Sequence, residues 1–379
     1  MLRREWPLLL QCCSLPRDTQ KIASLLSAVR DFDSLFRLAD EHSVVAHLAT
    51  ALATVPDAPI PATLLSALRD RHRLQSLFTL TMAAELFRIR DRLDQSGIEF
   101  VVVKGPVLSL RAYGDPAARR YVDLDLLIRH DDNLRAAEAL VRAGYVSQIP
   151  IEAIRAGKIP GEYLFRRPDT NIIFELHTEK TFRYCPLPLP IEKYLQTKTF
   201  LQLDGQAIPV LSLEDEFVLI CIHGAKHFWE RLMWISDVAA MVHRHPELDW
   251  KCIQQSAEEV GAARMVRLAL LLADRLLHGP VPLPMKDEVA RDSVSVRLAE
   301  QIETWLPFAG CAAPPVAQRA FFRFRVAGSG VAGARYLTRL SFSPTEEDWS
   351  SELDGTSRRF AEILRRPFRL AKKYRRPEP

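Results

Sequence analysis

Two aspartates inside a hydrophobic β-strand constrain this chain more than any other feature of its sequence. Residues 119–130 read RRYVDLDLLIRH, and apolar residues at every second position from Val122 to Ile128 alternate with Asp123 and Asp125. Aspartate is depleted from strands, and a buried carboxylate is costly unless it is paired or bound to a metal ion. The fold must therefore supply a positively charged partner for two carboxylates on one face of this strand.

The spacing of apolar residues along the sequence differs between the regions before and after this strand. Residues 18–96 carry apolar side chains at positions i, i+3, i+4 and i+7, which predicts helices. The short run IEFVVV (98–103) is rich in β-branched residues and is bounded by Lys104-Gly105-Pro106, as expected for a buried strand. GEYLFRR with TNIIFELHTE predicts one hairpin, and KTFLQLDGQAIPVL predicts a second that turns at Asp204-Gly205. Helical patterns resume after Ser212, and Asp215 three residues later predicts an acidic variant of the capping box at the start of the next helix.

We therefore expect an α+β fold with an α/β-like core. A small mixed β-sheet with helices, over residues 97–211, would form this core. An N-terminal helical region (1–96) would precede it, and a C-terminal helical domain with a basic tail (212–379) would follow.

The net charge, the cysteine pattern and the length of the apolar runs exclude several classes of protein. A net charge of +4 over 379 residues does not by itself indicate nucleic-acid binding. The six cysteines are scattered and form no CxxC pair, which favours a reduced, cytoplasmic protein over a disulfide scaffold or structural zinc site. MLRREWPLLLQCC has too short an apolar run for a signal peptide, and no stretch approaches 18 apolar residues, so no transmembrane segment is expected.

The aspartate pair has two interpretations. Residues i and i+2 of a strand point the same way, roughly 6.5 to 7 Å apart, so Asp123 and Asp125 could ligate divalent ions for phosphoryl or nucleotidyl transfer. Glu175 in NIIFELHTE interrupts another apolar strand and would be the third carboxylate, with Ile173 and His177 on its own face. Alternatively, the aspartates form salt bridges with the arginines that flank them, namely Arg119, Arg120 and Arg129.

The segment GIEFVVVKGPVLSLRAYGDPAARRYVDLDLLI resembles the opening of nucleotidyltransferases of the polymerase-β superfamily. More narrowly, it resembles a large bacterial group of uncharacterised nucleotidyltransferases, and the later FELH and HGAKHFWERLMWISDVAAM are similar to that group's pattern. The resemblance covers about residues 80–245, and it implies that residues 97–211 form a nucleotidyltransferase catalytic core whose small mixed sheet is the palm. It implies transfer of a nucleoside monophosphate from an NTP donor, with Asp123, Asp125 and Glu175 as catalytic residues that hold Mg²⁺ (or Mn²⁺).

One motif departs from the superfamily. Most members have Gly-Ser after the first strand to hold the triphosphate, whereas this chain has Lys104-Gly105, as the narrower group does. An ammonium before a helix N-terminus can neutralise phosphate oxygens, although Lys104 could also be a solvated strand-end lysine. Arg119 or Arg120 could brace the triphosphate or simply pair with the aspartates.

A second cluster lies in HGAKHFWERLMWISD. His223, Lys226 and His227 share about one helical face, but no glutamate follows the first histidine and no third ligand is evident, so zinc is not expected. Lys226 and His227 are candidate nucleotide contacts. The alternative is ordinary helix packing with Trp229 and Trp234 in the core.

The remaining expectations concern partners and alternatives. The acceptor could be a small molecule, a protein or RNA. The general base that takes the proton of the acceptor hydroxyl could be Glu175 or Asp125. Nine basic residues in 358–376 could contact an acidic surface or form a solvated terminal helix. The alternative functions are a phosphotransferase with the same metal site and a catalytically degenerate nucleotidyltransferase fold that binds a nucleotide or a partner.

Overall fold

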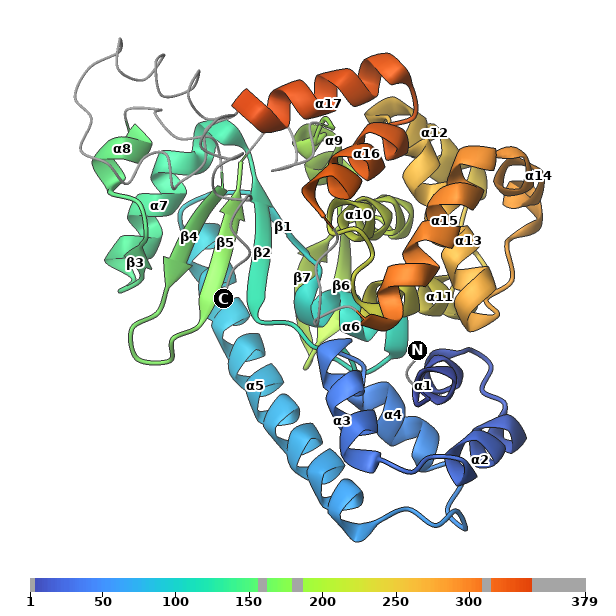
Figure 1. Cartoon of the computed structure of the whole chain (residues 1–379). Helices are drawn as coiled ribbons and strands as arrows, with labels where there is room; N and C mark the ends of the chain where they lie inside the picture. The colour runs from blue at the N-terminus through green and yellow to red at the C-terminus, as the bar shows by residue number, and fades with distance from the viewer. Residues whose placement is uncertain (1–3, 156–161, 179–186, 309–314, 343–379) are drawn as a thin grey trace.

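The computed structural model describes residues 4–155, 162–178, 187–308 and 315–342, and it shows the expected α+β fold (Figure 1). One mixed sheet is flanked by the long helix α5 on one side and by a large group of helices on the other. None of the described helices is long and apolar enough to cross a membrane. The basic segment 358–376 lies outside the described residues.

The sheet contains both predicted hairpins. Its strands, in spatial order, are β3 (Val146–Ser147), β4 (Glu162–Arg166), β5 (Ile173–His177), β2 (Asp123–Ile128), β1 (Phe100–Val103), β7 (Gln206–Val210) and β6 (Thr199–Leu203). The antiparallel pairs β4–β5 and β6–β7 are the hairpins. Strand β2 is antiparallel to β1 but parallel to β5, so the sheet is mixed, as expected.

One residue of the aspartate strand lies differently from the expectation. The alternation in the sequence placed Val122 inside the strand, whereas the strand begins at Asp123 and Val122 is 64% exposed. The reason is that the ladder with β5 starts at the pair Asp123–Ile173, so Val122 lies before the first strand pair.

The two faces of the sheet differ in polarity because strand side chains alternate. One face carries Leu124, Leu126 and Phe174, which pack in a buried cluster with Leu86 of α5 (Ala62–Gln95) and Leu140 of α7 (Asn133–Arg142). The short elements beside this layer are η1 (His130–Asp132) and α8 (Ile151–Arg155). The opposite face carries the aspartates.

The N-terminal and C-terminal helices share one hydrophobic core, which contains, for example, Leu48 and Leu232. The N-terminal helices are α1 (Trp6–Cys13), α2 (Thr19–Ser27), α3 (Phe32–Glu41) and α4 (Val45–Leu52). Those after the sheet are α10 (Leu213–Lys226), α11 (Leu232–Arg244), α12 (Trp250–Val260), α13 (Ala263–Leu277), α14 (Leu283–Arg291), α15 (Ser293–Trp305), η2 (Leu306–Phe308), α16 (Val316–Val326) and α17 (Gly330–Phe342). Two further helices, α6 (Gly105–Tyr113) and α9 (Ile191–Gln196), lie within the sheet region. The three-region division of the sequence remains a prediction.

Helix α10 is capped at both ends by defined contacts. At its start the Ser212 hydroxyl accepts a hydrogen bond from the Asp215 amide (3.1 Å), as the serine and the acidic residue three positions on predicted. At its end Phe228 and Trp229 have positive φ, and the Trp229 amide donates to the Gly224 carbonyl (2.9 Å). This turn folds the fully buried Trp229 ring back over Gly224, where a Cβ atom would lie 2.3 Å from the ring.

We therefore predict that Gly224→Ala destabilises the protein. The indole ring is buried and cannot move without repacking the core, so the loss should be about 1–3 kcal/mol. Gly330→Ala is the matched control, because the nearest atom to its added Cβ would lie 3.9 Å away. Urea denaturation of the two variants measures the difference, and equal stabilities would contradict the close packing of Trp229 on α10.

Candidate active site

The turn between β1 and α6 places a lysine over the aspartate strand. Lys104 has φ 59° and ψ −142°, a conformation that is unusual for a residue with a side chain, and Gly105 has φ 47°. At Gly105 the backbone approaches β2 so closely that a Cβ would lie 3.6 Å from the carbonyl oxygen of Asp123. From this turn Lys104 Nζ reaches Asp125 Oδ2 at 2.8 Å.

The three predicted carboxylates lie on one face of the sheet. The parallel pairing of β2 and β5 sets Asp125 directly beside Glu175, and Asp123 lies two residues earlier on the same face. Asp125 is 3% exposed. The side chain of Asp123 is partly buried, and within the described residues it makes no hydrogen bond or ion pair. The strand pairing therefore assembles the group that the sequence predicted.

Two further residues of this face were not among the predicted site residues. His177 Nε2 lies 2.8 Å from Asp125 Oδ1 and 3.5 Å from Glu175 Oε2. Glu162 on β4 is paired across the sheet with His177, and its charge helps to raise the pKa of Glu175. The signal for His177 was its position two residues after Glu175. No local signal identified Glu162, because its approach depends on the β4–β5 register.

The pKa values on this face show an excess of negative charge. Burial raises the pKa of Glu175 to about 8, and the charges of Asp125, Glu162 and Asp123 add to the effect. The pKa of Asp123 is also raised, first by burial and then by Asp125. Burial would raise the pKa of Asp125 as well, but Lys104 and His177 hold it well below its usual range. Burial opposes the charge of Lys104, yet Asp125 and the other acids raise the pKa of this lysine.

This set of ligands fits a divalent cation. Carboxylate oxygens are the ligands that Mg²⁺ and Mn²⁺ prefer, and Asp125, Glu175 and His177 each offer a ligand atom within 4.8 Å of the others. Lys104 alone cannot neutralise the acids gathered here. A cation at this face would therefore relieve the repulsion that raises the pKa of Glu175 and of Asp123.

Helix α10 contributes basic residues to a neighbouring pocket. Lys226 and His223 line it together with Lys104 and His177, and the empty space, including its mouth, measures about 480 Å³. His227 lies beside this pocket, with its ring centroid 4.7 Å from that of His223. Burial, with Lys226 and Lys104 nearby, lowers the pKa of His227 to about 3, so this imidazole is neutral. Of the two predicted α10 contacts, Lys226 thus lies at the pocket and His227 beside it.

Arg119 is engaged elsewhere. Its Nε donates to Asp237 Oδ2 of α11 at 2.9 Å, and both side chains are buried. The hydroxyl of Tyr113 donates to the other oxygen of Asp237 at 2.8 Å. Arg119 is close enough for its charge to act on Asp123, but its guanidinium forms a structural ion pair. Tyr113 is therefore part of the same hydrogen-bond network.

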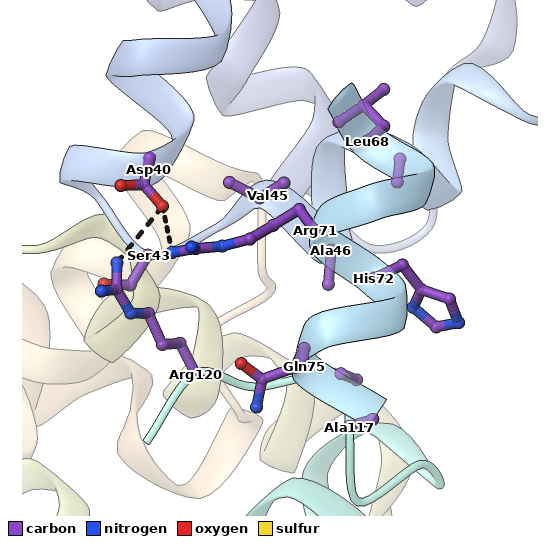
Figure 2. A pocket seen from close by; sticks show the side chains of 12 residues that line it. Asp40, Ser43, Val45, Ala46, Leu68, Arg71, His72, Gln75, Ala117 and Arg120 are labelled. Carbon is purple, nitrogen blue, oxygen red and sulfur yellow. Dashed lines mark hydrogen bonds and ion pairs between the residues drawn. The ribbon is translucent and has the colours of Figure 1, made fainter. Parts of the chain in front are cut away.

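Arg120 turns away from the aspartates toward the N-terminal helices. Figure 2 shows Arg120 and Arg71 converging on the carboxylate of Asp40 in a second pocket, and Arg120 Nη1 lies 3.2 Å from Asp40 Oδ1. The structure therefore does not bring Arg120 to the sheet face that carries Asp123, Asp125 and Glu175, which we call the carboxylate face. Arg129, the third flanking arginine, pairs with Glu99 and Glu192 rather than with the aspartates.

We predict that Arg119→Ala costs about 3–5 kcal/mol of stability, because it leaves the Asp237 carboxylate buried without its cation. Arg291→Ala is the control, since the pair of Arg291 with Asp287 is exposed and its loss should be barely measurable. Urea denaturation of both variants provides the test. A similar small loss in the two variants would show that the Arg119–Asp237 pair is not structural.

Comparisons with known proteins identify the family of this chain. The model of a family described as uncharacterised nucleotidyltransferase matches residues 28–278, which is more than half of the chain. No curated protein matches. Among solved structures, lincomycin-bound LnuA, a lincosamide antibiotic adenylyltransferase, is 12% identical, with 42% of this chain and 96% of that chain covered and a TM-score of 0.29. An antigenic nucleotidyltransferase-like protein from Paracoccidioides brasiliensis is 16% identical, with coverages of 58% and 92% and a TM-score of 0.32. On the extent of the family match, the chain belongs to the family of uncharacterised nucleotidyltransferases.

Proposed function

We propose that this protein is a metal-dependent nucleotidyltransferase that moves a nucleoside monophosphate from an NTP to a hydroxyl group of an acceptor. The observation that carries the proposal is the pairing of Asp125 with Glu175 on adjacent strands, with Asp123 on the same face and Lys104 at the strand–helix turn. Family membership supports the same reaction class. The acceptor is a small molecule, a protein or an RNA end.

In this reaction the acceptor oxygen bonds to the α-phosphorus while the bond from that phosphorus to the α,β-bridging oxygen breaks, and pyrophosphate leaves. The hydroxyl proton passes to a carboxylate. Glu175 is the candidate base, because both oxygens of Asp125 are already in contact with other side chains, those of Lys104 and His177. Catalysis of this kind depends mainly on positioning and electrostatic stabilisation.

The acids and the lysine have separate tasks. Asp123, Asp125 and Glu175 would hold Mg²⁺ or Mn²⁺, which when bound neutralises phosphate charge. Lys104 would bind phosphate oxygens at the N-terminus of α6, where free backbone amides also favour anions. Lys226 lines the adjoining pocket and would add positive charge there.

One observation favours a second candidate, a nucleotide-binding protein without catalysis. The ammonium of Lys104 already contacts Asp125 at 2.8 Å and provides part of the charge that a metal ion would supply. A protein of this kind would bind nucleotides whether or not metal and the aspartates are present.

Calorimetry with ATP, GTP, CTP and UTP, with and without Mg²⁺, tests the first proposal against the second. We expect Mg²⁺-dependent binding of one nucleotide that EDTA abolishes and that Asp123→Asn/Asp125→Asn loses. Asp204→Asn, in the exposed turn of the β6–β7 hairpin, should bind like the unmodified protein. Binding that is independent of both metal and the aspartates would support the binding protein. No binding by folded protein would contradict both candidates.

For Lys104→Met we predict nucleotide affinity about 10- to 100-fold weaker, because a charge-assisted hydrogen bond of roughly 1.5–3 kcal/mol is lost. Lys198→Met is the control, since Lys198 pairs with Glu99 and not with the aspartates. The same calorimetric titration measures both. An unchanged affinity in Lys104→Met would mean that this lysine serves only to neutralise Asp125.

A further inference from the structure

The carboxylate face also contains a histidine nitrogen, which a purely magnesium-dependent site does not need. His177 follows Glu175 by two residues in β5, so both side chains lie on the face of the sheet that also carries Asp125 of β2. Its Nε2 atom lies within 2.8 Å of Asp125 and 3.5 Å of Glu175. The histidine is therefore inside the group of acids and not at its edge.

The spacing of these atoms suits a single ion. Neighbouring ligand atoms about 2.0–2.2 Å from one octahedral ion lie roughly 3 Å apart. The two contacts of Nε2 lie close to that value, and all three ligand atoms lie within 4.8 Å of one another. The side chains come from paired strands, so the strand register holds them near this spacing.

The chemistry of the three ligands distinguishes between metals. Mg²⁺ prefers oxygen ligands and keeps several waters. Imidazole nitrogen binds first-row transition ions more strongly than it binds Mg²⁺, and carboxylates suit Mn²⁺ as well as Mg²⁺. A set of two carboxylates and one imidazole therefore favours Mn²⁺ or a related transition ion.

We infer that His177 is a direct metal ligand beside Asp125 and Glu175, and that it makes this site select Mn²⁺ over Mg²⁺. The inference rests on the proposed function and adds to it the class of metal and a ligand outside the predicted acids. The competing explanation is that His177 only orients Asp125 through their 2.8 Å contact. In that case the histidine is a positioning residue and never bonds to the ion.

Electron paramagnetic resonance of Mn²⁺ bound to the full chain separates these explanations. The chain is studied alone and with a non-hydrolysable analogue of the nucleotide found by calorimetry. A directly bound imidazole produces ¹⁴N coupling in pulsed spectra, whereas a histidine that only orients Asp125 does not. We expect this coupling in the unmodified protein and its loss in His177→Gln.

Affinity gives a second measurement. His177→Gln should bind Mn²⁺ at least roughly tenfold more weakly than the unmodified protein does. The affinity for Mg²⁺, which is lower already in the unmodified protein, should change little. His243→Gln is the matched control, because His243 is exposed at the end of α11. Circular dichroism confirms that each variant is folded.

The outcomes separate this inference from the proposed function. Mn²⁺ binding that Asp125→Asn removes but that shows no ¹⁴N coupling would overturn the role of His177 and leave the metal-dependent transferase standing. No Mn²⁺ binding by the unmodified protein, with or without nucleotide, would overturn both. Coupling that persists in His177→Gln would assign the nitrogen to another residue and also overturn the inference.

Discussion

The parallel pairing of β2 with β5 is the constraint on which the rest of this structure depends. It sets the nearly fully buried Asp125 beside the partly buried Glu175. Repulsion between such groups is strong at low dielectric. Other contacts on the carboxylate face compensate this concentration of negative charge.

The turn after β1 supplies one compensating positive charge, that of Lys104. A lysine with positive φ is strained, and such strain persists only where the surroundings over-determine it. Here Gly105, which follows the lysine, allows the turn to approach β2. The close approach makes possible the contact of Lys104 with Asp125. The strained backbone of this turn is thus compensated by the ion pair that it makes possible.

A second set of interactions ties the helices to the segment that leads into β2. Arg119 is held by Asp237 of α11, and Arg120 by Asp40 of α3, so consecutive residues attach to C-terminal and N-terminal helices. These helices also share one hydrophobic core. The segment before Asp123 is therefore anchored on both sides, which limits how far the aspartates can move relative to α10 and its pocket.

The sequence by itself determined the local structure and the residue types of the site. Periods of 2 and 3.6 are properties of neighbouring residues, so the strands other than the two-residue β3, both hairpins and the α10 cap could be predicted. The carboxylates of β2 and β5 could be singled out by their residue type. Only the tertiary structure decided which partners meet. Glu162 reaches Glu175 through strand register, His177 reaches Asp125 across the β2–β5 ladder, and both Arg119 and Arg120 bond to helices distant in sequence. A flanking arginine has the same charge whichever acid it meets, and only the packing of distant helices selects that acid.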